Sequence, residues 1–236
     1  MSAAPPAYRP VATYDELVRG EFIVRVYQHL LAAVVAFVAF EALFINLGVA
    51  RALYDLISGS GPTWLLIVGG FMIVSWLATN AAHDILNPSR QYLGLFGLSL
   101  VYAALFAPFL YYFFEVQPDG ATSVWAAALI TAIGFAGLSA VAFVTRRDLS
   151  FLRPLVLWGL VSSLVLIVAA VLFGLELGIW FSVAMIALAG ASILYQTQTI
   201  IRRYPTEAYV GASVQLFASV MLLFWYVLRL VGQLRS

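Results

Sequence analysis

The sequence contains no cysteine and no lysine, and only 10% of its 236 residues are charged. Without cysteine there is no disulfide and no thiolate chemistry. The formal net charge of +1 lacks the basic footprint of a nucleic-acid-binding protein, so we expect no nucleic-acid partner. A charged fraction this small, against roughly 25% in soluble domains, favours a chain surrounded by lipid.

The signatures of common enzymes and pumps are also missing. There is no His-Glu-x-x-His helix, no Gly-x-Ser-x-Gly elbow and no glycine-rich phosphate loop. The two histidines, His29 and His83, lie near the ends of apolar segments. His83 and Asp84 are adjacent, but two metal ligands without a third favour an ordinary polar loop. We expect no enzymatic activity, no metal site and no cofactor.

Long apolar runs are what the sequence has in abundance, with 64% hydrophobic residues. Runs of about 20 apolar residues recur, each long enough to cross a bilayer as a helix, whereas β-barrels show shorter alternating segments. We predict an all-α integral membrane protein with a disordered cytoplasmic tail at residues 1–12 and a single domain at residues 13–236. The predicted spans are residues 26–48, 64–81, 92–114, 123–144, 154–172, 179–201 and 210–231.

The pattern Thr13-Tyr14-Asp15-Glu16 fits a capping box and predicts a helix start at Thr13. Arginines gather in the N-terminal flank and the even-numbered connections: Arg9, Arg19, Arg25, Arg90, Arg146, Arg147, Arg153, Arg202 and Arg203. The odd-numbered connections hold Arg51 and the acidic residues Asp55, Glu115, Asp119 and Glu176. This bias predicts a cytoplasmic N-terminus. Seven full spans would place the C-terminus outside, and a re-entrant last segment would place it inside.

Three features inside the spans stand out. Glu41 is the one carboxylate placed clearly within a span, where an unpaired charge is costly. It is either a proton or cation site, or a side chain that reaches water at the outer interface, and the second reading is favoured. Pro108 predicts a kink, and Gly134 with Gly137 predicts a close helix contact.

Polar residues gather on two neighbouring apolar segments near the C-terminus. By helical spacing, one face of the sixth span holds Ser192, Tyr195, Gln196 and Thr199. One face of the seventh holds Gln215, Ser219 and Tyr226. Polar faces inside apolar segments turn toward each other or toward water rather than toward lipid. We therefore expect the functional site here.

Four stretches together resemble the Bax inhibitor-1 family over roughly residues 21–232. The loop after the fourth span reads Thr145-Arg146-Arg147-Asp148-Leu149-Ser150-Phe151-Leu152 and is similar to the family's loop motif. The other three are Arg25-Val26-Tyr27 at the start of the first span, Tyr195-Gln196-Thr197-Gln198 at the end of the sixth, and residues 212–232. The last stretch looks like the final helix of the bacterial inner-membrane branch.

The resemblance implies a seven-helix fold in which the last helix is central and six pack around it. It also implies a passive, pH-sensitive calcium leak gated by two aspartates that share a proton. Those aspartates correspond to Gln196 and Ser219 here, and neither residue titrates near neutral pH. The acid-pair switch therefore cannot operate in this chain as it does in the family.

Three functions remain open at this point. The first is a passive cation leak through a cluster of Gln196, Ser219 and Gln215, with Tyr195 and Asp148 at its cytoplasmic mouth. The second is a regulatory protein that binds a membrane-embedded ATP-dependent protease, as some bacterial relatives do. The third is a proton-coupled carrier that uses Glu41.

Overall fold

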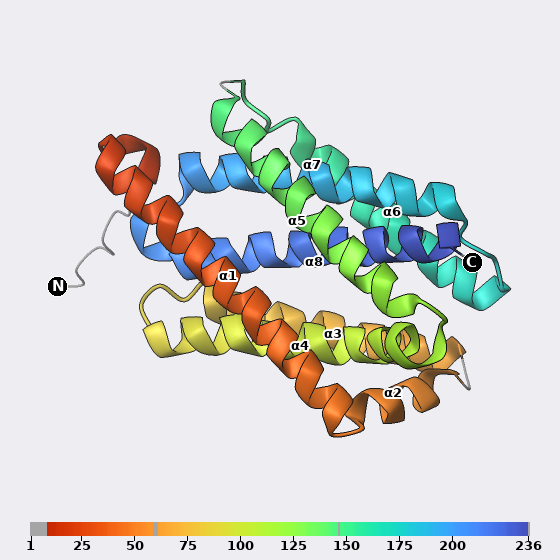
Figure 1. The fold of residues 1–236 in the computed structure, drawn as a ribbon. Coiled ribbons are helices and arrows are strands. Elements are labelled where there is room, and N and C mark those ends of the chain that lie inside the picture. Colours follow the sequence, from red (N-terminus) through yellow and green to blue (C-terminus); the bar gives the residue numbers. More distant parts are fainter. Residues whose placement is uncertain (1–8, 59–60, 146, 236) are drawn as a thin grey trace.

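The computed structural model describes residues 9–58, 61–145 and 147–235, and the described chain is a bundle of helices joined by short connections (Figure 1). Its helices are α1 (Glu16–Asn46), α2 (Val49–Ser58), α3 (Gly61–Ala82), α4 (Pro88–Tyr111), α5 (Gly120–Val144), α6 (Leu152–Phe173), α7 (Ile179–Arg203) and α8 (Tyr209–Arg235). All but α2 are long and apolar enough to cross a membrane. The predicted all-α architecture with seven spans is confirmed.

The connections divide the bundle into two ends. One end holds the start of α1 and the loops at residues 83–87, 145–151 and 204–208, and we call it the basic end. The other holds the connections at residues 47–48, 117–119 and 174–178, and we call it the acidic end. Helix α8 is continuous over 27 residues, about 40 Å at 1.5 Å per residue. Its last turn lies at the acidic end, opposite the start of α1 (Figure 1), so α8 runs from one end of the bundle to the other.

Helix α8 is the most buried of the seven spans. It packs against α1, α3, α4, α5 and α7, whereas α6 packs mainly against α7 and α3. The predicted arrangement around a central last helix therefore holds for five neighbours in direct contact, with α6 one layer further out. The small side chains Gly211, Ala212 and Ser213 at its start are all buried, which lets the surrounding helices approach closely.

The start of α1 differs in detail from the capping-box prediction. Asp15 is the residue that caps the helix, because its carboxylate accepts from the Val18 backbone N–H at 3.0 Å. Thr13 instead belongs to a short 3-10 turn, Val11–Thr13, and its hydroxyl donates to the Pro10 carbonyl. Aspartate at this position satisfies the same free N–H groups that a threonine would.

The segment just before α1 is folded onto the bundle. Val11 is fully buried, and its N–H donates to the Tyr204 carbonyl at 2.7 Å. Residues 10–13, the last part of the expected tail included, are therefore tied to the connection between α7 and α8. The expectation of disorder stays a prediction for residues 1–8, which lie outside the described part.

Helix α2 was not expected. It is short, with Arg51 and Asp55 paired at 3.9 Å on its exposed side, and Tyr54 lies against the rings of Tyr111 and Tyr112. One polar face and one apolar face on ten residues suit a helix that lies along the membrane surface at the acidic end. The charges of Arg51 and Asp55 had marked this stretch only as a connection.

The closest glycine contact between two membrane-spanning helices is not the predicted one. A Cβ at Gly137 would meet nothing within 4 Å, and one at Gly134 only the Leu223 side chain at 3.9 Å. A Cβ at Gly94 of α4 would instead lie 2.5 Å from the Ala78 carbonyl oxygen of α3. The prediction of close packing at Gly134 and Gly137 is therefore wrong, and Gly94 is the residue that brings α3 and α4 together.

Helix α4 continues through Pro108 and ends at Tyr111. A π-helical turn, Tyr112–Val116, follows it directly. Proline lacks the N–H that would bond to the preceding turn, and π turns occur next to such irregular positions. The π-helical turn therefore begins four residues after Pro108, and a kink at Pro108 itself stays a prediction.

Candidate functional site

The polar faces of α7 and α8 meet in a closed ring of three side chains. The Gln196 amide nitrogen donates to the Ser192 hydroxyl at 3.1 Å, the Ser192 and Ser219 hydroxyls lie 3.0 Å apart, and the Ser219 hydroxyl donates to the Gln196 amide oxygen at 2.9 Å. Because the Ser219 proton is used toward Gln196, Ser192 must donate to Ser219. Each hydroxyl then donates once and accepts once, so both hydroxyl protons are used within the ring.

The ring brings together two of the predicted site residues, Gln196 and Ser219. The hydroxyls of Ser192 and Ser219 are buried, with 4% of each residue exposed. None of the ring's groups carries a charge near neutral pH. The ring is therefore an uncharged, hydrogen-bonded contact between α7 and α8, at the place where the resemblance puts a pair of aspartates.

A cavity of about 380 Å³ adjoins the ring. Predicted residues Tyr195, Gln196 and Gln215 line it, together with Arg153 and Tyr204 toward the basic end. Burial raises the pKa of Tyr204 to about 12, so its hydroxyl remains neutral. The cavity thus has a mixed polar and apolar lining, and Ser192 and Gln196 of the ring form part of its wall.

Gln215 does not join the ring. Its amide nitrogen lies 3.4 Å from Nε2 of His83, and the Nδ1 of His83 bonds to the Thr79 carbonyl at 2.7 Å. Since the carbonyl can only accept, Nδ1 carries the proton and Nε2 accepts from Gln215. His83 is thereby a link between α3 and α8, as the loop interpretation allowed, and its ring lies against Gly211.

The loop motif is bound to the end of α7 by Gln198, which is 4% exposed. Its side-chain oxygen accepts from the Leu149 N–H at 2.6 Å, and its nitrogen donates to the Arg147 carbonyl at 2.6 Å. Arg202 of the same helix lies 4.0 Å from the Asp148 carboxylate. Two motifs that are 49 residues apart at Leu149 and Gln198 are therefore one structural unit.

The Asp148 side chain forms a hydrogen bond within this loop. Its carboxylate accepts from the Ser150 N–H at 2.9 Å, and this bond, with a smaller contribution from Arg202, lowers the pKa of Asp148. Asp148 is largely exposed and does not line the cavity beside the ring. Arg147 contributes its carbonyl oxygen to the loop, and Arg146 lies outside the described residues.

Glu41 lies far from the ring, on α1 toward the acidic end. It is 5% exposed, and neither carboxylate oxygen has a hydrogen-bond partner among the described residues. The favoured expectation that it reaches water is therefore not what the structure shows. Sequence reasoning could not foresee this burial, because depth along a span does not reveal which face of the helix points into the bundle.

A second polar site, missed from the sequence, lies at the acidic end. Arg229 of α8 donates to the Leu177 carbonyl and sits over the Phe181 ring, 5.8 Å from its centre. Arg229 and Gln233 line a cavity of about 480 Å³ that also includes Glu176. The signal that could have revealed this site is an arginine, Arg229, inside an apolar segment.

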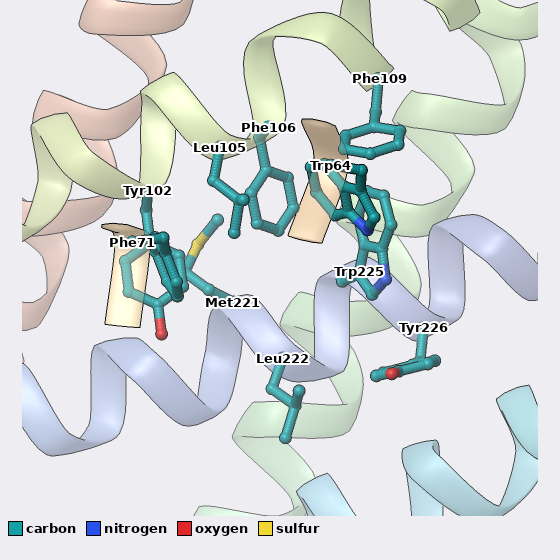
Figure 2. Close-up of a pocket in the computed structure, with 10 residues that line it drawn as sticks. All are labelled: Trp64, Phe71, Tyr102, Leu105, Phe106, Phe109, Met221, Leu222, Trp225 and Tyr226. Atoms are coloured by element: carbon teal, nitrogen blue, oxygen red, sulfur yellow. The ribbon is translucent and has the colours of Figure 1, made fainter. Parts of the chain in front are cut away.

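An apolar region separates the two ends beside α8. Figure 2 shows a cavity of about 150 Å³ between α3, α4 and α8, with Phe106, Trp225 and Met221 among the side chains around it. Trp225 packs edge-on against Phe106 and Phe109 at 5.3 and 4.5 Å. Its lining is mostly aromatic and aliphatic, which offers a dehydrated ion few oxygen ligands.

Fold and site together define an all-α, multi-pass membrane protein whose polar groups face the inside of a helical bundle. In the described ranges, no three His, Asp or Glu residues are close enough to hold a metal. The sequence profile of the inhibitor of apoptosis-promoting Bax1 matches residues 19–236, and the chain belongs to this family. The resemblance carried by the motifs is confirmed.

Three bacterial relatives are similar over part of their length. An uncharacterized protein of Pseudomonas aeruginosa, PA2604, is 34% identical over 118 residues, 49% of this chain and 52% of the relative. An uncharacterized membrane protein of Vibrio cholerae is 28% identical over 127 residues, 51% and 54% of the two chains. The Escherichia coli modulator of FtsH protease, YccA, is 33% identical over 103 residues, 43% and 47%. The aligned part of this chain thus spans about half the length of each relative.

Proposed function

We propose that this chain is a regulatory protein of the inner membrane, not an enzyme, that binds and modulates a membrane-embedded ATP-dependent protease. The observation that carries the proposal is the neutral ring of Ser192, Gln196 and Ser219. A protein that opened and closed with pH would need titratable groups at this contact, and the ring has none.

Similarity to a relative named as a modulator of FtsH protease supports this choice of partner. The YccA of a second E. coli strain carries the name inner membrane protein, and the arginine bias favours a cytoplasmic basic end. A cytoplasmic protease domain would meet that end, where the 145–151 loop is presented. We expect the partner to bind the chain before Val11, because Val11 itself is fixed to the bundle through its hydrogen bond to Tyr204.

The test is degradation of a membrane substrate by the purified protease in proteoliposomes, with and without this protein. We expect the full chain to change the degradation rate, and we expect deletion of residues 2–9 to abolish that change. The deletion keeps Val11 and its hydrogen bond, so the bundle should unfold at the same temperature as the full chain. A rate that never depends on this protein would reject the proposal.

A passive cation leak is the second candidate. It is favoured by the cavities that lie toward the two ends, one beside the ring and one beside Arg229. Calcium flux into proteoliposomes at pH 6 and pH 8 separates the two candidates. Equal flux at both pH values that is lost in Gln196→Leu would support a leak without an acid switch. Flux no greater than in empty vesicles would reject it and leave the regulatory function.

A further inference from the structure

Two cavities at the acidic end share part of their walls. Each has a volume of about 480 Å³. Trp64 of α3 and the α8 residues Trp225, Arg229 and Gln233 line both of them, and Figure 2 shows the two indole rings beside each other. The Arg229 side chain therefore borders open space within the last turns of the central helix.

Arg229 is a half-buried cation without an ion pair in the described part of the chain. It lies six residues before the end of α8 at Arg235, roughly 9 Å along the helix axis. An arginine at this depth can extend to water, but this one is turned toward the Leu177 carbonyl and the Phe181 ring. A guanidinium has five N–H donors, so donors remain for a ligand in the cavities.

The cavity between α6 and α8 also holds a negative charge. Glu176, in the connection between α6 and α7, is exposed and lines this cavity together with Arg229. Both residues lie in the described part of the chain, and they form no ion pair with each other. Opposite charges that line one cavity without pairing are complementary to a ligand that carries both signs.

Another part of this cavity's wall is apolar and belongs to the membrane span of α6. It includes Ile167, Ala170 and Val171, which share one face of the helix by their spacing. Leu175 lines the cavity and is 60% exposed, so the cavity opens to the surroundings of the bundle. A matching ligand therefore has an alkyl chain as well as two opposite charges.

We propose that this cavity binds a zwitterionic phospholipid with a primary ammonium group, namely phosphatidylethanolamine. The Arg229 guanidinium binds the phosphate, because its planar fork matches two phosphate oxygens. The Glu176 carboxylate accepts a hydrogen bond from the ammonium group, and an acyl chain lies along the apolar face of α6. This site is independent of the proposed protease regulation.

The headgroup charges make the site selective among phospholipids. Phosphatidylglycerol has no ammonium group, so its phosphate would leave the negative charge of Glu176 unmatched. Phosphatidylcholine carries a quaternary ammonium group, which has no N–H to donate to the carboxylate. Helix α6 packs mainly against α7 and α3, so the bound lipid fills space between α6 and the central helix.

Native mass spectrometry of the purified full chain tests this selectivity. The delipidated protein in detergent is mixed with equal amounts of phosphatidylethanolamine, phosphatidylcholine and phosphatidylglycerol, and the bound lipids are identified by mass. We expect phosphatidylethanolamine to bind several-fold more than either of the other two. Equal binding of the three lipids would overturn the proposal.

Glu176→Gln should change the selectivity without abolishing lipid binding. The amide removes the charge that attracts the ammonium group, so phosphatidylethanolamine should lose its advantage over phosphatidylglycerol. The matched control is Glu115→Gln, which is exposed at the same end and lies outside both cavities, and it should keep the original preference. An unchanged preference in Glu176→Gln would overturn the assigned role of the carboxylate.

Arg229→Lys tests the phosphate contact, because it keeps the positive charge and removes the planar fork. We expect binding of phosphatidylethanolamine to fall several-fold. Arg235→Gln, exposed on the same helix and outside both cavities, should bind as the unmodified chain does. Undiminished binding by a folded Arg229→Lys variant would overturn the proposal. Since Glu176 is exposed, the Glu176→Gln comparison decides the question even if Arg229→Lys does not fold.

Inorganic phosphate separates a lipid site from a site for soluble anions. It has no alkyl chain to place along α6, so an excess over the lipid should not displace phosphatidylethanolamine. Displacement by inorganic phosphate at the concentration of the lipid would overturn the lipid assignment and identify a site for a soluble anion.

Discussion

The Ser219 hydroxyl on α8 donates a hydrogen bond to the Gln196 side-chain oxygen on α7 at 2.9 Å. These two residues stand where the family resemblance places a pair of aspartates. Two aspartates that share a proton move apart when that proton is lost, because two like charges at close range repel each other. An amide and a hydroxyl have no such second state, so we expect this hydrogen bond between α7 and α8 to be independent of pH in the physiological range.

Opening the ring should weaken the contact between α7 and α8. Ser219→Ala removes one donor and leaves the Gln196 oxygen and the Ser192 proton unpaired in a buried site. We expect a loss of about 1–2 kcal/mol in the free energy of unfolding, measured by denaturant titration in mixed micelles. Ser162→Ala, at an exposed position of α6, is the control and should change little. Equal stability of the two variants would show that the ring does not hold the helices.

Release of the 145–151 loop should expose its backbone to protease. Gln198→Ala removes the hydrogen bonds to the Leu149 N–H and the Arg147 carbonyl. We expect trypsin to cleave after Arg147 several-fold faster, because cleavage requires local unfolding. Cleavage after Arg90, in the first turn of α4, serves as the internal standard. An unchanged ratio of the two rates would mean that Gln198 does not restrain the loop.

The Asp148 carboxylate should keep its bond to the Ser150 N–H down to strongly acidic pH. That bond lowers the pKa of Asp148 below the ordinary value of 3.8. A lowered folded-state pKa gives stability that is present above the unfolded-state pKa and lost as pH falls through the folded-state value. The NMR shift of the Ser150 amide proton should therefore titrate with a midpoint below 3.8, and Asp148→Asn should abolish the transition. A midpoint at or above 3.8 would contradict the assignment.

The positions of the membrane spans were predictable because they depend on composition along the chain. Which side chains contact each other depends instead on how each helix is rotated about its own axis in the bundle. The sixth predicted span, residues 179–201, matches α7 at Ile179–Arg203. Helical spacing also placed Ser192 and Gln196 on one face. It could not tell that Gln215 turns to His83, since that contact joins residues 132 positions apart.

The property that the sequence predicted least well was which side chains are buried inside the bundle. Hydrophobic residues face both lipid and protein here, so the usual contrast between a polar outer face and an apolar inner face is absent. Val35 and Ala33 are both apolar and neighbours on α1, yet Val35 is 60% exposed and Ala33 is fully buried. For the same reason, the sequence could not predict the burial of Glu41 or the close approach of α3 and α4 at Gly94.

Glu41→Gln should not destabilise the protein. The amide keeps the size of the carboxyl group, and the structure gives neither oxygen a partner that would be lost. We expect the thermal midpoint to stay the same or rise, since no charge then has to be accommodated. Glu21→Gln, exposed on the same helix, is the control. A pH-dependent flux abolished by Glu41→Gln would support the proton-coupled carrier, and an unchanged flux would reject it.

Gly94 and Gly97 occupy the same helix one turn apart, and alanine should have opposite effects at the two positions. A Cβ at Gly94 would lie 2.5 Å from the Ala78 carbonyl oxygen, whereas at Gly97 nothing lies within 4 Å. The contact at Gly94 is with backbone, which cannot rotate aside, so α3 and α4 must separate. We expect Gly94→Ala to lower the free energy of unfolding by about 1–3 kcal/mol.

Gly97→Ala should instead leave stability unchanged or raise it by up to about 1 kcal/mol, because alanine is the better helix former. Both variants are measured by the same denaturant titration, so the chemical change is identical and only the surroundings differ. Separation of α3 from α4 would also disturb His83, which follows α3 directly and accepts from Gln215 of α8. Gly94→Ala should therefore weaken the α8 contact as well. Equal stability of the two alanine variants would show that α3 and α4 are not in close backbone contact at Gly94.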